Sequence, residues 1–242
     1  AKSLKAVGEQ CEVLVLCLPT DGVVREMMLG EGGALTGNTR VRWVVDCSTI
    51  DVTAARQLGA DLLERGVWYF DSPVSGGPQG ARDGTLTIMV GGDQAQMEEI
   101  LPVYQVMGRN IVHVGPSGSA QQFKLINQIL TWVNHAVICE AAALAKRAGL
   151  DPARVYETIR TGAARSGQLD IIAPKVLNGD FSAAFYLRHF VKDMGIASQE
   201  CRDRGLELEV LEQVLADCRQ IEAEGHGGEG TQALIRHYPW AD

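Results

Sequence analysis

The sequence predicts an α/β region followed by a region made only of helices, and three observations support this fold class. Apolar runs of strand length alternate with helical patterns through residues 1–116. Residues 115–149 then form one long helical segment, which opens on Gly-Pro-Ser-Gly and closes on Gly149. Only helical patterns follow. We therefore expect a doubly wound sheet in a domain of residues 1–116 and a helical domain of residues 117–242, joined by the long helix.

The first region contains five segments with the composition of buried strands. Each is a mainly apolar run of strand length that ends at glycine, proline or a polar residue, and such runs are typical of strands covered on both faces of a parallel sheet. They are residues 12–19, 42–48, 68–73, 86–92 and 110–115.

Helices are expected between these strands. A helix tail in residues 1–10 precedes the first strand, and a short helix at residues 23–29 follows it. Ser48 or Thr49 should cap the next helix, because a hydroxyl at that position accepts a bond from a free amide of the first turn. Residues 94–107 should form a single helix, whereas the glycine-rich stretch 74–85 is expected to be a loop.

The second region shows helical patterns alone. Pro152 stands where proline is tolerated, in the first turn of a helix. Further helices are expected at residues 168–177, 185–204, 208–224 and 231–237.

The long helix carries an unusual polar stripe. Apolar residues cover nearly every other side of it, which predicts burial all round. Lys124, Asn127, Gln128 and Thr131 follow one another at helical spacing and so share one face. One interpretation is that the lysine reaches solvent while the amides bond to nearby backbone. The other is a cleft, in which apolar surroundings would lower the pKa of the lysine and suit it to proton transfer.

The composition narrows the possible functions. A net charge of −8 over 242 residues argues against nucleic acid or an anionic membrane as the main partner, because both attract basic surfaces. The six cysteines form no CxxC pair, so we expect neither disulfides nor a metal site. No apolar run approaches the roughly 18 residues of a membrane helix. A cytoplasmic location is expected, with the matrix of an organelle as the alternative.

A second polar segment follows the third predicted strand. Ser75, Gly76 and Gly77 would place a hydroxyl and bare backbone amides at a strand end, which makes a good cradle for a carboxylate. The same glycines also fit a simple tight turn. From the residues alone, both interpretations remain open.

Together the two segments resemble the 3-hydroxyisobutyrate dehydrogenase-like branch of the β-hydroxyacid dehydrogenases. The pattern D-x-P-V-S-G-G-x-x-x-A-x-x-G-T-L-x-I-M-V-G-G matches from Asp71 to Gly92, and G-x-x-G-x-x-x-x-x-K-x-x-N matches from Gly115 to Asn127. The pair Asn127-Gln128, where many members have two asparagines, resembles the tartronate semialdehyde reductase subgroup.

The resemblance implies an NAD- or NADP-dependent oxidoreductase that acts on a small β-hydroxy acid or its semialdehyde, without a metal. It implies that Lys124 exchanges the hydroxyl proton and that Asn127 orients the hydroxyl. The expected partners are this substrate and further copies of the chain, in a dimer or tetramer. The residues implied to bind substrate are Ser75, Gly76, Gly77 and Gln128, and those implied at the cofactor are Leu18, Pro19, Ser48, Thr49, Lys192 and Asp193.

Two features qualify this interpretation. From the residues alone, Lys192 and Asp193 would form an exposed ion pair worth under about 1 kcal/mol, so their role rests on the resemblance. The family's opening strand, GxGxxG turn and helix are also not found, and GEGG at residues 30–33 does not replace them because it follows a helix. We expect an incomplete Rossmann-type sheet that lacks more than one βαβ unit.

These missing elements leave an alternative, a truncated binding or assembly module without catalysis. A 6-phosphogluconate dehydrogenase is disfavoured, because it would need more basic residues for a sugar phosphate and a much longer helical domain.

Overall fold

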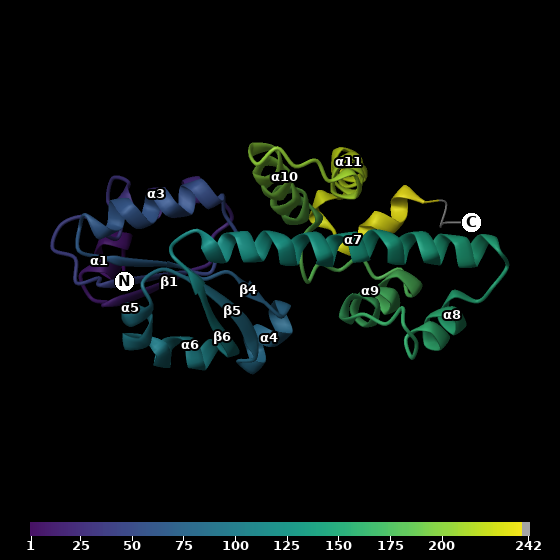
Figure 1. Ribbon diagram of the computed structural model, residues 1–242, viewed down its shortest axis with the longest axis horizontal. Helices are drawn as coiled ribbons and strands as arrows, with labels where there is room; N and C mark the ends of the chain where they lie inside the picture. Colours follow the sequence, from purple (N-terminus) through teal and green to yellow (C-terminus); the bar gives the residue numbers. More distant parts are fainter. Residues whose placement is uncertain (239–242) are drawn as a thin grey trace. The chain divides into compact units, whose positions relative to one another are not determined.

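The computed structural model describes residues 1–238, which divide into two compact units. The first unit comprises residues 1–125 and the second begins at residue 126. Figure 1 shows the sheet in the first unit and helices alone in the second, as the sequence predicted. The α/β class followed by an all-helical region is therefore confirmed.

The sheet has six strands rather than five. Three neighbouring strands, β1, β2 and β3, are parallel, whereas β5 runs antiparallel to β3 and β4 and parallel to β6. The additional strand is β4, whose two residues are too short to give a recognisable pattern. The bounds are β1 Val13–Leu16, β2 Trp43–Asp46, β3 Trp68–Asp71, β4 Val74–Ser75, β5 Leu86–Gly91 and β6 Gly108–Gly115.

The parallel strands end level with one another. Leu16 pairs with Asp46, and Asp46 pairs with Asp71, so the last residues of β1, β2 and β3 lie side by side. Because the carboxyl ends of parallel strands meet at one edge of a sheet, the three loops that follow them are neighbours.

The helices of the first unit differ from expectation in three details. Asp51, and not Ser48 or Thr49, caps α3 by accepting a bond from the amide of Ala54. The expected helix at residues 94–107 breaks at Ile100, just before Pro102, whose nitrogen carries no hydrogen. The expected loop at residues 74–85 contains β4 and α4. The bounds are α1 Leu4–Gly8, α2 Asp21–Leu29, α3 Val52–Leu63, α4 Gly77–Asp83, α5 Gln94–Glu99 and α6 Leu101–Met107.

Helices cover both faces of this sheet (Figure 1). On one face, α2 and α3 pack through Met28 and Leu62 against strand residues such as Leu14. On the other, α5 and α6 pack through Met97 and Tyr104 against residues from β2, β3 and β5. Burial on both faces explains why these strands have nearly continuous apolar sequences.

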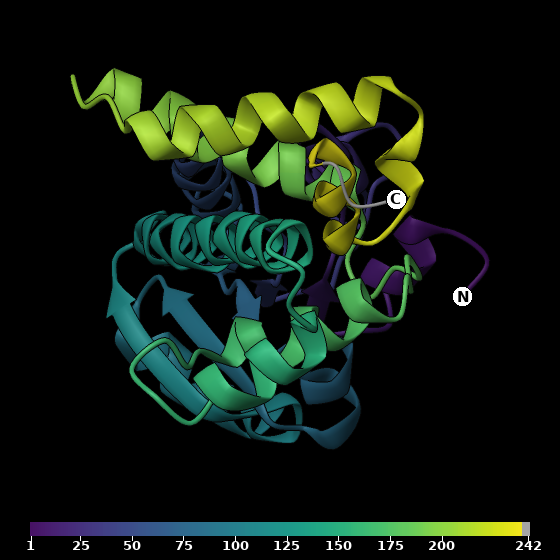
Figure 2. The same ribbon diagram turned by 90° about the vertical axis from the view of Figure 1, so that its right-hand side faces the viewer.

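The second unit is built from helices. Helices α10 and α11 lie side by side (Figure 2), and residues 231–237 form a 3₁₀ helix where an α-helix was expected. Among residues 1–238, no helix combines the length and the apolar character needed to cross a membrane. The bounds are α7 Ser119–Arg147, which begins in the first unit, then α8 Pro152–Ile159, α9 Gly167–Leu177, α10 Leu187–Asp203, α11 Glu209–Ala223, η1 His226–Gly228 and η2 Thr231–His237.

Helix α7 is not buried all round, so that prediction was wrong. On its polar stripe, Lys124 and Gln128 are buried, at 8% and 3% exposed, and Asn127 and Thr131 are half-buried. The opposite flank is apolar and open, and its most exposed large side chains are Phe123, Ile126, Leu130, Val137 and Leu144.

Candidate active site

Lys124 lies in the second turn of α7 and is directed at Val74, the first residue of β4. Its ammonium donates a hydrogen bond to the carbonyl of Val74 at 2.8 Å. The side chain is buried, so it does not extend into solvent as one interpretation of the polar stripe required. The residue after Val74 is Ser75, which places the lysine beside the segment predicted to bind a carboxylate.

The backbone at Ser75, Gly76 and Gly77 has a conformation that requires glycine. Ser75 ends β4 opposite Thr87, and the next two residues have φ angles of +128° and +62°. Side chains with a Cβ rarely adopt such angles. Both glycines are exposed, so their backbone is open to a ligand.

Asp71 holds the beginning of α7 against the sheet. Its carboxylate, which is fully buried at the end of β3, accepts hydrogen bonds from the amides of Gly118 at 2.9 Å and Gln121 at 3.0 Å. Burial raises the pKa of Asp71 to about 6, even though these amides favour the ionised form. Lys124 lies one turn further along the helix that this carboxylate anchors.

The loops after β1 and β2 are bonded to each other. The amide of Leu18 donates to the hydroxyl of Ser48 at 2.8 Å, and the carbonyl of Ser48 accepts from the side chain of Gln121 at 2.9 Å. Pro19 is exposed and Thr49 is half-buried. The four residues predicted at the cofactor in this unit therefore lie together at the carboxyl edge of the sheet.

The remaining predicted residues form a bonded row in the second unit. Asn127 donates to Gln128 at 2.9 Å, and Gln128 donates to the Asp193 carboxylate at 2.6 Å. The other carboxylate oxygen lies 3.0 Å from the Lys192 ammonium. Because Asp193 is only 2% exposed, this is not the exposed ion pair expected from the residues alone.

The structure thus gathers the predicted residues into two groups, one in each unit, and α7 contributes to both. Residues 1–125 hold Lys124, the Ser75 segment and the two strand-end loops, whereas the later residues hold the bonded row. Sequence reasoning gave no role to Asp71 or Gln121. An acidic residue directly after a buried strand was the available signal for Asp71.

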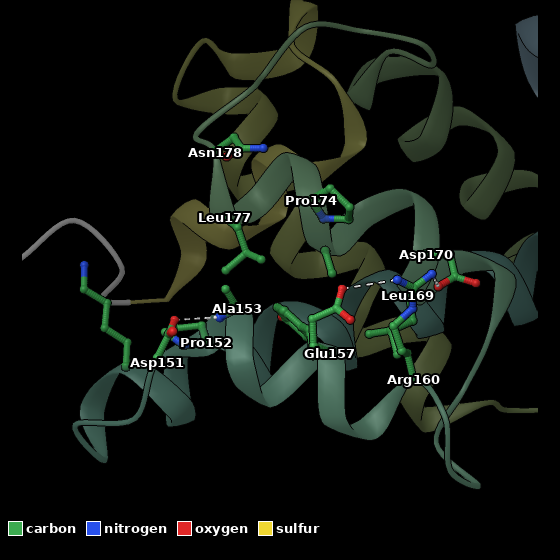
Figure 3. A pocket seen from close by; sticks show the side chains of 13 residues that line it. Asp151, Pro152, Ala153, Glu157, Arg160, Leu169, Asp170, Pro174, Leu177 and Asn178 are labelled. Carbon is green, nitrogen blue, oxygen red and sulfur yellow. Dashed lines mark hydrogen bonds and ion pairs between the residues drawn. The ribbon is translucent and has the colours of Figure 1, made fainter.

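A hollow in the second unit does not coincide with these residues. It measures about 720 Å³ and lies between α8 and α9. Figure 3 shows Arg160 at its wall, where the guanidinium pairs with Glu157 at 3.2 Å and Asp170 at 2.9 Å. These three charged side chains therefore satisfy one another.

The described residues show no arrangement suited to metal binding. In residues 1–238, no group of three or more histidine, cysteine, aspartate or glutamate side chains could hold a metal ion. All six cysteines are free thiols. Burial raises the pKa of Cys47 and Cys139 to about 12, so both remain thiols near neutral pH.

Comparison with known proteins matches nearly the whole chain to two family profiles. Residues 1–115 match the NAD-binding domain of 6-phosphogluconate dehydrogenase. Residues 118–238 match the NAD-binding region of NADP-dependent 3-hydroxyisobutyrate dehydrogenase.

Relatives and solved structures agree with these profiles. A 2-hydroxy-3-oxopropionate reductase from Escherichia coli is 33% identical over 86% of this chain and 71% of its own length. A 2-(hydroxymethyl)glutarate dehydrogenase from Eubacterium barkeri is 32% identical over 95% of this chain and 77% of its own. The crystal structure of a 3-hydroxyisobutyrate dehydrogenase from Salmonella typhimurium superposes with a TM-score of 0.89 at 26% identity, covering 98% of this chain and 82% of that one.

Fold, profiles and relatives together define an NAD(P)-dependent oxidoreductase. The chain belongs to the 3-hydroxyisobutyrate dehydrogenase family of β-hydroxyacid dehydrogenases.

Proposed function

We propose that the chain transfers a hydride between NAD(P) and a small β-hydroxy acid or its semialdehyde, with Lys124 as the general acid and base. The observation that carries this proposal is the buried Lys124 ammonium, held 2.8 Å from the carbonyl that precedes Ser75. A positioned proton donor and a neighbouring anion cradle are what reduction of an aldehyde acid requires. Two relatives, a 2-hydroxy-3-oxopropionate reductase and a 2-(hydroxymethyl)glutarate dehydrogenase, support the same substrate class.

The substrate carboxylate is assigned to Ser75, Gly76 and Gly77. Their hydroxyl and exposed backbone are suited to an anion, and no side chain at the two glycines blocks its approach. With the carboxylate held there, the hydroxyl carbon of a small substrate lies within reach of the lysine that bonds the preceding carbonyl.

The cofactor is assigned to the loops after β1 and β2. Leu18 and Pro19 supply apolar surface, and Ser48 and Thr49 supply hydroxyl and backbone groups at the same edge of the sheet. This mixture fits a flat ring with a carboxamide group better than a phosphate, so we assign these loops to the nicotinamide half. When bound, the nicotinamide supplies or accepts the hydride.

Asn127 is assigned to orienting the substrate hydroxyl, one turn beyond Lys124 on the same helix. Its amide is fixed by Gln128, which is fixed in turn by the buried carboxylate of Asp193. Both polar atoms of the Gln128 side chain are engaged in this row, which suits Gln128 to hold Asn127 in place. Lys192 balances the charge of Asp193.

The test is titration of the 242-residue chain with NADH and NADPH, followed through tryptophan fluorescence, and then assay with 3-hydroxyisobutyrate and 2-hydroxy-3-oxopropionate. We expect saturable binding of one nucleotide and turnover of one substrate. A folded sample that binds neither nucleotide would contradict the proposal and favour the non-catalytic binding or assembly module.

We also propose that the chain forms a homo-oligomer through the open flank of α7. Leu130, Val137 and Leu144 recur every seven residues on this flank and are 64%, 49% and 71% exposed. An apolar stripe with this spacing is suited to packing against a second helix of the same kind.

Val137→Asp is expected to convert a dimer or larger assembly into monomers, because it places a charge in the apolar stripe. Light scattering after size exclusion should give at least twice 26.1 kDa for the native chain and 26.1 kDa for the variant. Val106→Asp, at an exposed valine of α6, is the matched control and should leave the mass unchanged. A monomeric native chain would refute the assembly but leave the catalytic proposal intact.

A further inference from the structure

Gln121 connects the first turn of α7 to the loop after β2. The residue is fully buried, and its side-chain amide bonds this loop in both directions. Its nitrogen donates to the Ser48 carbonyl at 2.9 Å, and its oxygen accepts from the Ile50 amide at 3.2 Å. One amide side chain thus satisfies a backbone acceptor and a backbone donor that would otherwise be buried without partners.

The bonds of Gln121 continue into the neighbouring loop. Ser48, whose carbonyl bonds Gln121, accepts a bond through its hydroxyl from the Leu18 amide at 2.8 Å. The Ser48 amide donates to Asp46, the last residue of β2, at 2.9 Å. A displacement of the Gln121 side chain would therefore disturb both loops that are assigned to the cofactor.

The backbone of Gln121 is fixed independently of its side chain. Its amide bonds the Asp71 carboxylate at 3.0 Å, so the first turn of α7 is held by β3 through the backbone and by the β2 loop through the side chain. Lys124 follows three residues later, on the next turn. The Gln121 side chain is thus a direct polar connection between the helix that carries the lysine and the Ser48 loop.

We propose that Gln121 is a positioning residue, which keeps the loops at Leu18 and Ser48 in register with Lys124. Its role in the reaction rests on the proposed function, whereas its effect on the loops does not. Misplacing a reacting group by about 1 Å can reduce a rate about 10²-fold, so a residue that touches neither substrate nor cofactor can still affect turnover.

The decisive variant is Gln121→Glu, because its chemistry changes with pH while its shape does not. A protonated carboxyl can replace the amide, since its hydroxyl donates to the Ser48 carbonyl and its carbonyl oxygen accepts from the Ile50 amide. An ionised carboxylate cannot donate and repels the Ser48 carbonyl. Asp71 bonds the same turn, and burial raises its pKa to about 6. Because Asp71 is present in both proteins, the variant is compared with the native chain at each pH.

Two readouts are measured at pH 5 and pH 8. One is hydrogen exchange at the amides of Leu18 and Ile50, and the other is the dissociation constant for the preferred nucleotide. At pH 8 we expect Gln121→Glu to exchange at least tenfold faster at these amides and to bind about tenfold more weakly. At pH 5 both values should return to within about threefold of the native chain.

Gln96→Met is the matched control. It removes another side-chain amide of the same unit, one that bonds the Trp43 indole at 3.2 Å, and it should change neither readout. Unchanged exchange at Ile50 in Gln121→Glu at pH 8 would overturn the inference, and so would faster exchange spread evenly over residues 1–125. If the native chain binds no nucleotide, the proposed function fails, and the exchange data alone decide the role of Gln121 in holding the loops.

Discussion

Lys124→Met should lower kcat for the preferred substrate about 10²- to 10⁴-fold, the usual loss when a general acid or base is removed. The native ammonium is buried and fixed on the Val74 carbonyl, so a proton is available at a defined position. Methionine has a similar length and fills the same space without a proton. Because the cofactor loops are held by other residues, nucleotide binding should change by less than about threefold. Stopped-flow or steady-state oxidation of the reduced nucleotide measures both quantities.

Lys175→Met provides the matched control for this experiment. Lys175 also donates a hydrogen bond to a backbone carbonyl, that of Ser182 at 3.1 Å, but it lies on α9 in the other unit. Its loss should leave kcat within about twofold of the native value. If both variants lose activity to the same degree, the effect of Lys124 is one of folding. If Lys124→Met keeps native turnover, the lysine is not the acid and base.

Strong local patterns in the sequence predicted much of this fold. The strands ending at Asp46 and Asp71 are continuous apolar runs because helices cover both of their faces, and this burial makes the pattern easy to recognise. Helix α7 was predicted from its length and its glycine boundaries. Strand β4 was not predicted, because two residues have no periodicity and form a strand only by pairing with β5.

The burial of α7 shows a second reason why the sequence does not predict every feature of the structure. Composition cannot separate an apolar side chain that faces a core from one that faces another molecule, so Leu130 and Val137 were expected to be buried and are exposed. The same limit applies to the site. Lys124 was identified from the polar stripe and the family resemblance, but the bonds of Gln121 join residues more than seventy positions apart. Such pairs are determined by tertiary structure and leave no local signal.

Lowering the pH should destabilise the second unit and stabilise the first. We expect His135 to cause the effect in the second unit. The ring is 2% exposed, and its Nε2 is bonded to Gln168 at 2.7 Å, while its Nδ1 has no hydrogen-bond partner among the described residues. Burial lowers the pKa of His135 to about 4. Between pH 6.5 and 4 the unfolded chain therefore binds a proton that the folded chain does not. Stability should fall by about 3 kcal/mol over this window as the pH is lowered.

Asp71 should have the opposite effect in the first unit. Its pKa is raised from 3.8 to about 6, so between these values the folded chain holds a proton that the unfolded chain has released. Lowering the pH through this window should stabilise the first unit by about 3 kcal/mol. Urea unfolding at pH 7.5 and pH 5 measures both effects, with Trp132 reporting on the second unit and Trp43 and Trp68 on the first.

Single substitutions separate the two contributions. On going from pH 7.5 to pH 5, the second unit of His135→Gln should lose about 2 kcal/mol less stability than that of the native chain, because glutamine takes up no proton. The first unit of Asp71→Asn should lack the native gain of about 1 kcal/mol over the same interval. Each substitution should leave the other unit unchanged, since the two groups belong to different compact units. If the stability of the variants changes with pH in parallel with that of the native chain, His135 and Asp71 do not control this pH dependence. The burial of the neutral imidazole and of the carboxyl would then not determine how the chain responds to acid.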